Sequence, residues 1–196
     1  MPEPLVVRHP IAAHLLAVLR DRTTGTAAFR AAARDLGMIV GYEALQYLPL
    51  TSRRIDELVA DDGEISVVGR IDTPLEPFDA PSLAAPAPCI VPILRAGLAI
   101  AEGLGRLLPD AAIGHIGLAR DEATLRPATY YAKLPPDIAK RETILADPML
   151  ATGGSAIAAM QLLRAAGARR VRFVCLLAAP EGLAAPAAAE PDLDVA

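Results

Sequence analysis

The sequence contains no tryptophan and only two cysteines, and aromatic residues make up 4% of the chain. It also lacks an excess of basic residues, because 19 Lys and Arg stand against 23 Asp and Glu, for a net charge of −4. Proteins that bind nucleic acid by neutralising its phosphates have the opposite balance. The composition therefore argues against a nucleic-acid partner. It leaves room for a small anionic ligand, which needs only a local group of donors.

Long apolar runs are absent as well. No run approaches the ~18 uninterrupted apolar residues of a membrane-spanning helix, and no apolar stretch follows a basic start at the N-terminus. We therefore expect no membrane partner and a cytoplasmic location. Cys89 and Cys175 each lie inside an apolar run, so we expect buried strand thiols without a chemical role.

Apolar residues are abundant, at 53% of 196 residues, which is enough to bury one sizeable core. We expect a single domain over 1–196, made of N-terminal helices (1–50), an arm or loop (64–88) and a ligand-binding core (89–196). The apolar spacing predicts a helix from Pro10 to about Arg20, and a second helix with Thr26 as its N-cap that ends before Pro49. Five prolines interrupt the short β-like pieces of the arm, which suits a peripheral position.

From Cys89 onward, short apolar strands alternate with helices. Strands of this kind are buried on both faces, which predicts an α/β fold with a central, mostly parallel sheet flanked by helices. The expected strands are 89–94, 113–119, 143–146 and 171–178, and the expected helices are 97–108 and 155–166. Ligands of such sheets bind outside the carboxyl ends of the strands, so the residues just after each strand are candidates for a site.

The strongest candidate is an apolar strand that ends in Asp147 and is followed by a Thr-Gly-Gly-Ser turn that opens a helix. Gly153 and Gly154 allow a close approach of the backbone, and the free N–H groups and dipole of a helix start attract phosphate. The hydroxyls of Thr152 and Ser155 add donors, while Asp147 is an acceptor for sugar hydroxyls. A lone Gly-Gly-Ser would be read as a plain loop with a serine N-cap, so the longer context decides.

That context, Asp147-Pro148-Met149-Leu150-Ala151-Thr152-Gly153-Gly154-Ser155, resembles the motif with which the uracil phosphoribosyltransferases, of the type I phosphoribosyltransferase family, bind phosphoribosyl pyrophosphate (PRPP). Pro148 stands where many relatives have a second acid, as it does in the uracil enzymes. Similar landmarks extend over most of the chain: His9-Pro10, Phe29-Arg30, Tyr42-Glu43-Ala44, Val91 to Gly97, Gly114 to Gly117, Arg120-Asp121, Tyr130-Tyr131, Lys133-Leu134-Pro135 and Ala178 to Gly182.

The resemblance implies transfer of a 5-phosphoribosyl group from PRPP to uracil, which gives UMP and pyrophosphate in pyrimidine salvage. Asp147 would be the catalytic residue, the segment 147–155 would bind PRPP, and Arg95 and Arg120 would hold its pyrophosphate. Mg²⁺ would arrive bound with PRPP, so no protein metal ligand is expected. The family also implies a homodimer or higher homo-oligomer; some relatives respond to GTP, for which no residue here gives support.

The chain departs from the family at three places. It ends at Ala196, before the Gly-Leu-Gly-Asp-Ala-Gly-Asp loop that reads uracil in the family, so we expect a C-terminally incomplete domain and assign no uracil-binding residue. Ala119 stands where relatives usually have tyrosine. Pro186 falls within the helix expected after Pro180, so we expect that helix to start late, with Pro186 in its first turn.

Two other features are given modest roles. We expect the three histidines, His9, His14 and His115, to be structural rather than general bases. The stretch Asp121 to Lys133 is interpreted as a hairpin over the active site, since a cationic sugar must be kept from water.

Three functions remain open on the sequence. The first is an active uracil phosphoribosyltransferase, and the second is a non-catalytic PRPP-binding or dimerisation protein that has lost its base site. The third, an RNA-binding regulator built on the same fold, is disfavoured by the net charge of −4 and by the lack of a basic stripe.

Overall fold

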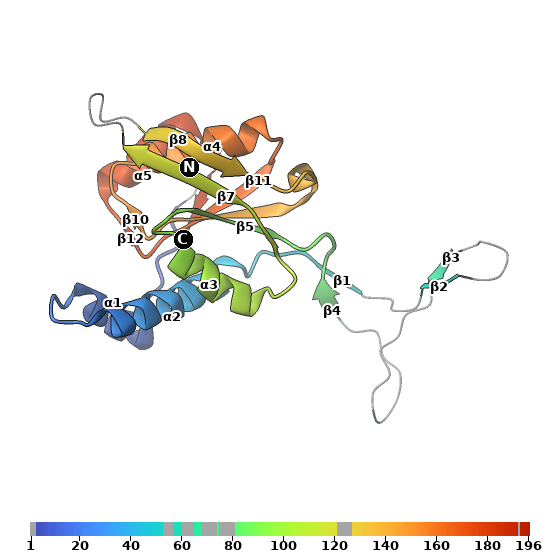
Figure 1. Cartoon of the computed structure of the whole chain (residues 1–196). Coiled ribbons are helices and arrows are strands. Elements are labelled where there is room, and N and C mark those ends of the chain that lie inside the picture. Colours follow the sequence, from blue (N-terminus) through green and yellow to red (C-terminus); the bar gives the residue numbers. More distant parts are fainter. Residues whose placement is uncertain are drawn as a thin grey trace. The chain divides into compact units, whose positions relative to one another are not determined.

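The computed structural model describes residues 3–52, 57–59, 65–67, 74, 81–120, 127–191 and 193–196 (Figure 1). The chain divides into two compact units: Met1–Gln46 together with Pro86–Ala196, and Tyr47–Ala85. The expectation of a single domain over the whole chain stays a prediction.

The smaller unit contains two short antiparallel pairs. Strand β1 (Leu50–Ser52) pairs with β4 (Pro81–Leu83), and β2 (Glu57–Val59) pairs with β3 (Ile65–Val67). The N–H of Ala84 donates to the carbonyl oxygen of Pro49 at 2.9 Å, which extends the first pair. The β-like pieces expected in the arm are therefore present where the structure describes it, although most of 68–80 lies outside the described residues.

The larger unit is built on a seven-stranded sheet of order β13-β11-β9-β5-β7-β8, with β6 also paired to β5. Every pairing is parallel except that of β8 with β7, which confirms the predicted α/β fold. The strands are β5 (Cys89–Leu94), β6 (Ala112–Ile113), β7 (His115–Arg120), β8 (Pro127–Lys133), β9 (Glu142–Ala146), β11 (Arg170–Val174) and β13 (Asp194–Val195). A separate parallel pair joins β10 (Met149–Leu150) to β12 (Leu177–Ala178).

Helices cover both faces of this sheet. Figure 1 shows α1 (Pro10–Arg20), α2 (Thr26–Ala44) and α3 (Leu98–Leu107) on one face, and α4 (Gly154–Ala165) and α5 (Pro180–Ala189) on the other. A short 3₁₀ helix, η1 (Ile138–Lys140), precedes β9. No helix within the described ranges is long and apolar enough to cross a membrane.

The core lies between the sheet and α4. Phe173, Leu145, Met160 and Leu163 are fully buried there, as expected for strands that face helices on both sides. The two cysteines are buried as predicted, and burial raises the pKa of the Cys89 thiol to about 11, so it stays protonated at neutral pH.

Three predicted boundaries need correction. The N-cap of α2 is Gly25, without a side-chain hydrogen bond, and Thr26 is already helical. The strand expected over 113–119 is interrupted at Gly114, whose N–H donates to Ile90 at 2.9 Å. The strand expected over 171–178 is also two pieces. Strand β11 pairs with β9 as far as Val174, and the chain then turns so that β12 pairs with β10.

The predicted late start of the last helix is wrong. Helix α5 begins at Pro180, and Pro186 lies in its interior. Pro180 suits the first helical position, where its missing N–H has no partner to lose, and the N–H of Leu183 bonds to Ala179 at 3.0 Å. An interior proline costs ~3 kcal/mol. The ring of Pro186 is buried against Gly153, and that contact offsets part of the cost.

Candidate active site

The carboxyl ends of β5, β7 and β9 meet at one edge of the sheet. Strand β5 lies between the other two, so the chain continues to one side of it first, at β7, and later to its other side, at β9. This change of direction is the place where parallel sheets open a crevice for ligands. Arg95 follows β5, Arg120 ends β7 and Asp147 follows β9, so the three predicted residues share this edge.

Backbone hydrogen bonds hold the start of the candidate segment in place. The N–H of Asp147 donates to Val174 at 3.2 Å, and the carbonyl oxygen of Pro148 accepts from Leu176 and Leu177, each at 3.1 Å. The pairing of β10 with β12 continues this attachment. Asp147 is thus fixed at the tip of β9 by the segment that follows β11.

Asp147 is half-buried, and no hydrogen bond or ion pair to its carboxylate exists within the described part of the chain. Burial raises its pKa from 3.8 to about 6. Cys175 lies close by, and its pKa is raised to about 12, first by burial and then by the charge of Asp147. At neutral pH the site therefore presents an ionised, unpaired acceptor beside a neutral thiol.

The turn after β10 leads directly into a helix N-terminus. Ala151 and Thr152 are exposed, and Gly153 has φ 79° and ψ −10°, a left-handed conformation that glycine adopts at no steric cost. Helix α4 begins at Gly154, and its N-cap, Gly153, offers no side chain. Among the residues that the structure describes, no side chain caps the N–H groups of this first turn, so they can bind an anion.

The side chains along the segment divide between core and solvent. Leu150 is 2% exposed and anchors the segment in the core, whereas Met149 is 60% exposed. Ser155, in the first turn of α4, is also exposed, so its hydroxyl is accessible beside the free N–H groups.

Arg95 lies in the turn between β5 and α3. Its side chain is exposed and makes no ion pair or hydrogen bond with any residue that the structure describes. The peptide bond between Leu94 and Arg95 is cis. Gly97 ends the turn, and its N–H donates to Ile93 at 2.9 Å. The turn lies directly against the end of β9, because a Cβ on Gly97 would overlap the carbonyl oxygen of Ala146.

The strand partner of Arg120, Pro127, lies close to the turn from Thr152 to Ser155. Arg120 pairs with Pro127 at the end of the β7–β8 pair that adjoins residues 121–126, and a Cβ placed on Gly154 would lie 3.6 Å from Cγ of Pro127. Residues 121–126, part of the hairpin expected over the site, lie outside the described residues, as does the side chain of Arg120. Pro127 belongs to the stretch that the sequence predicts as a hairpin over the site, but its proximity to Gly154 was not predicted, because it joins two distant parts of the chain.

The histidines lie away from this edge or in the sheet. His9 caps α1, with Nδ1 accepting from the N–H of Ile11 at 3.2 Å, which is a structural role. His14 is exposed on α1, and His115 begins β7.

The charged groups offer little to a resident metal ion. Over the described residues, no three His, Cys, Asp or Glu side chains come together as a set of ligands. Asp147 contributes one carboxylate to the site. This donor set fits a cation that is held mainly by the oxygens of its own ligand.

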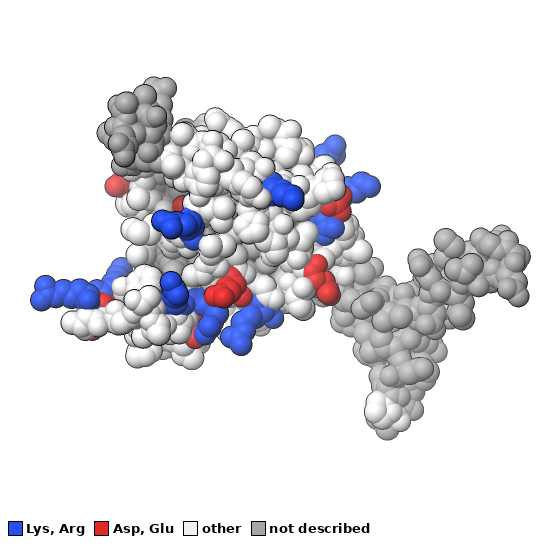
Figure 2. Space-filling view, viewed as in Figure 1, with Lys and Arg blue, Asp and Glu red and all other residues white. Residues whose placement is uncertain are grey.

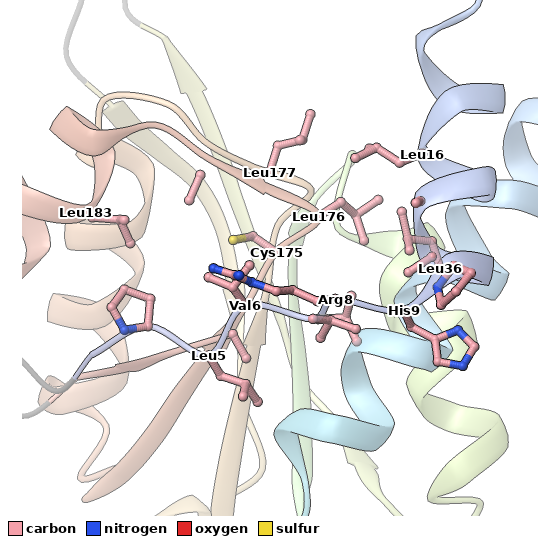
Figure 3. Close-up of a pocket in the computed structure, with 18 residues that line it drawn as sticks. Leu5, Val6, Arg8, His9, Leu16, Leu36, Cys175, Leu176, Leu177 and Leu183 are labelled. Carbon is pink, nitrogen blue, oxygen red and sulfur yellow. The ribbon is translucent and has the colours of Figure 1, made fainter.

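A hollow of about 630 Å³ lies beside the segment that fixes Asp147 (Figure 3). Its walls come from the N-terminal segment, α1, α2 and the stretch after β11. The lining is apolar apart from Arg8, His9 and the thiol of Cys175. A polyanion is therefore poorly matched to this cavity, and the strand ends followed by Arg95 and Asp147 suit one better. On the face drawn in Figure 2, the basic and acidic residues that the structure describes are interspersed and form no continuous stripe.

Comparison with known proteins shows the family of the chain. The family model of uracil phosphoribosyltransferase matches residues 6–196. A uracil phosphoribosyltransferase of Paracoccus denitrificans (strain Pd 1222) is 43% identical over 190 residues, which are 97% of this chain and 82% of that relative. A uracil phosphoribosyltransferase of Alkaliphilus oremlandii (strain OhILAs) is 43% identical over 195 residues, 100% of this chain and 86% of the relative.

The fold is also similar to that of a solved protein. A structure from Aquifex aeolicus superposes with a TM-score of 0.85 at 28% identity, over 98% of this chain and 85% of that one. The similarity therefore extends over nearly the whole chain and includes the candidate segment.

Proposed function

Because the chain belongs to the uracil phosphoribosyltransferase family, we propose that it transfers the 5-phosphoribosyl group of PRPP to N1 of uracil, forming UMP and releasing pyrophosphate. The observation that carries the proposal is the segment 147–155, in which a strand-end carboxylate is joined to an uncapped helix N-terminus. That arrangement matches a ligand with a ribose at one end and a phosphate at the other. The reaction places the protein in the salvage of a free base.

The 5′-phosphate of PRPP binds at the turn from Thr152 to Ser155. The N–H groups of the first turn of α4 donate to its oxygens, and the helix dipole favours its charge. The exposed hydroxyls of Thr152 and Ser155 add donors. Gly153 and Gly154 keep the backbone free of side chains, so the phosphate reaches the N–H groups directly.

Asp147 accepts hydrogen bonds from the ribose hydroxyls. Its half-buried position and lack of another partner among the described residues leave the carboxylate available for this role. Cleavage of the bond between C1 and the pyrophosphate oxygen builds positive charge on the ribose ring. The negative charge of Asp147 stabilises that ring, and no covalent intermediate with the protein is required.

Arg95 and Arg120 bind the pyrophosphate, which gains negative charge as it leaves. A guanidinium fork suits bidentate binding of phosphate, and Arg95 is exposed and unpaired within the described residues. Mg²⁺ bound to PRPP neutralises charge on the leaving group. Among the predicted site residues, Asp147 is the one that has a carboxylate.

The assembly and location are part of the same proposal. A homodimer or higher homo-oligomer in the cytoplasm is consistent with the family and with a reaction on small soluble substrates. A non-catalytic PRPP-binding protein is not favoured, since the relatives that match nearly the whole chain are named as enzymes. We assign no residue of this chain to uracil.

The direct experiment is to incubate the protein with Mg·PRPP and radiolabelled uracil and to measure labelled UMP. We expect UMP to form only when both substrates are present, and Asp147→Asn to reduce its rate. Labelled cytosine and adenine serve as control bases. Tight binding of Mg·PRPP without any UMP would instead support the non-catalytic alternative.

A further inference from the structure

Helix α5 packs directly on the segment that precedes the phosphate-binding turn. A Cβ on Gly182 would overlap the carbonyl oxygen of Leu150 and would lie 2.7 Å from that of Ala151. Position 182 therefore accepts only glycine, because any side chain would push the helix off the segment. The same contact is supported at the start of α5, where the N–H of Ala179 donates to Leu150 at 2.9 Å.

Four residues further along α5, Pro186 lies against Gly153 of the phosphate-binding turn. A Cβ on Gly153 would lie 2.7 Å from Cδ and 3.1 Å from Cγ of Pro186, and 3.2 Å from Cβ of Ala185. Pro186 is buried, so its ring is held between α5 and the turn. Residues four apart in a helix share a face, so Gly182 and Pro186 together hold both ends of the short bend 150–153.

Proline is unfavourable at position 186, which lies inside a helix. It removes a helical hydrogen bond, and its ring crowds the preceding turn. Alanine, which occupies five of the ten positions of α5, would make a better helix here. The contact that distinguishes proline from alanine is the ring against Gly153, a residue whose left-handed conformation sets the direction of the first N–H groups of α4.

We propose that Pro186 is a positioning residue for the phosphate-binding turn. Its ring has no rotatable side-chain bond, so it forms a rigid wall that limits the freedom of Gly153, the most flexible kind of residue. With the wall in place, the N–H groups of Gly154 and Ser155 stay directed toward the phosphate before it binds, and the entropy cost of binding is smaller. The inference rests on the proposed function, since it concerns the same turn.

The test compares Pro186→Ala with Pro180→Ala, which makes the same replacement at the exposed first position of the same helix. Ribose 5-phosphate is the probe, because it carries the phosphate without the pyrophosphate. We expect Pro186→Ala to bind it ~3- to 10-fold more weakly, while its melting temperature stays equal or rises. The backbone ¹⁵N order parameters of Gly153, Gly154 and Ser155 should be lower in the free variant, and Pro180→Ala should match the wild type in affinity and in order parameters.

Unchanged affinity and unchanged order parameters in Pro186→Ala would overturn the inference. Loss of folding in that variant would overturn it as well, because Pro186 would then be a packing residue. The proposed function fails in a different way: the wild-type protein would bind neither ribose 5-phosphate nor Mg·PRPP. The order parameters of the free protein are independent of that result, so the two failures are distinguishable.

Discussion

Gly97 lies so close to Ala146 that any side chain at position 97 would overlap the carbonyl oxygen of residue 146. The contact joins the turn that carries Arg95 to the strand end that carries Asp147. The two predicted ligand-binding groups are therefore held together by a backbone contact, even though they are separated by about fifty residues of sequence.

Gly97→Ala should disturb both halves of the site. The added methyl would overlap Ala146 and lie 2.8 Å from the backbone nitrogen of Ile93, so the turn must move. We expect a loss of ~1–3 kcal/mol in the free energy of unfolding and weaker binding of Mg·PRPP. Urea unfolding and titration calorimetry measure the two effects.

Gly105→Ala is the matched control, since it lies in the adjacent helix α3 and an added Cβ meets nothing within 4 Å. It should stabilise the protein by ~0.5–1 kcal/mol and leave PRPP affinity unchanged. Equal effects of the two substitutions would show that the contact between Gly97 and Ala146 does not organise the site.

The neighbouring glycines of the turn should respond differently to alanine. Gly153→Ala forces alanine into the left-handed region, which costs ~1–2 kcal/mol of conformational free energy. The new methyl would also overlap the ring of Pro186, so both the free energy of unfolding and the affinity for PRPP should fall. At Gly154 the nearest atom to a new Cβ is 3.6 Å away, so Gly154→Ala should leave the free energy of unfolding unchanged. Its affinity for ribose 5-phosphate should still fall, because the methyl blocks the approach of the phosphate. Thermal unfolding together with calorimetry separates the two variants, and retained affinity in Gly154→Ala would count against the phosphate position.

Asp147→Asn should stabilise the free protein at neutral pH. The folded state raises the pKa of Asp147 to about 6, so it binds protons more tightly than the unfolded state, and stability falls as pH rises from about 4 to about 6. Replacing the carboxyl should therefore raise the free energy of unfolding by at most ~3 kcal/mol above pH 6, and should leave it unchanged below pH 4. Urea unfolding between pH 4 and 8 measures the difference. A gain that is the same at every pH would contradict the burial of an ionisable group.

The same variant should bind Mg·PRPP poorly. An asparagine lacks the charge and one acceptor of the carboxylate that holds the ribose hydroxyls. The protein would then be more stable and less active, which is the expected trade at a functional site. Unimpaired binding in Asp147→Asn would assign the ribose to other groups.

Arg95→Ala and Arg120→Ala should each weaken binding of pyrophosphate ~10-fold or more, because each removes charge-assisted hydrogen bonds to the ligand. Arg95 is exposed, so Arg95→Ala should also leave the protein folded. Ribose 5-phosphate should bind these variants as it binds the wild type. Arg169→Ala, a charge removal at an exposed position after α4, is the control. If pyrophosphate binds all three variants alike, its site lies elsewhere.

Much of the fold could be predicted from the sequence. The apolar runs at Cys89 and Thr143 and the Pro10 helix start are local signals, and they predicted β5, β9 and α1 within one residue. The breaks at Gly114 and after Val174 could not be predicted, because each follows from a hydrogen bond to a distant strand. Pro186 was misplaced for the same reason, since its partner, Gly153, is 33 positions away in the printed sequence.

The candidate site, too, could be predicted only in part from the sequence. The turn from Thr152 to Ser155 was recognised because its glycines and hydroxyls are adjacent in sequence. The supports at Gly97, Pro127 and Pro186 come from three other elements, and a single sequence contains no distances between them.

The central claim is that the phosphate of PRPP binds the N-terminus of α4. The most direct measurement is amide chemical-shift mapping of ¹⁵N-labelled protein during a titration with Mg·PRPP. We predict that the amides of 152–155 shift most, together with those of Asp147 and Arg95. The account would be contradicted if these amides stayed unchanged while those lining the apolar cavity, such as Leu176 and Leu177, shifted instead.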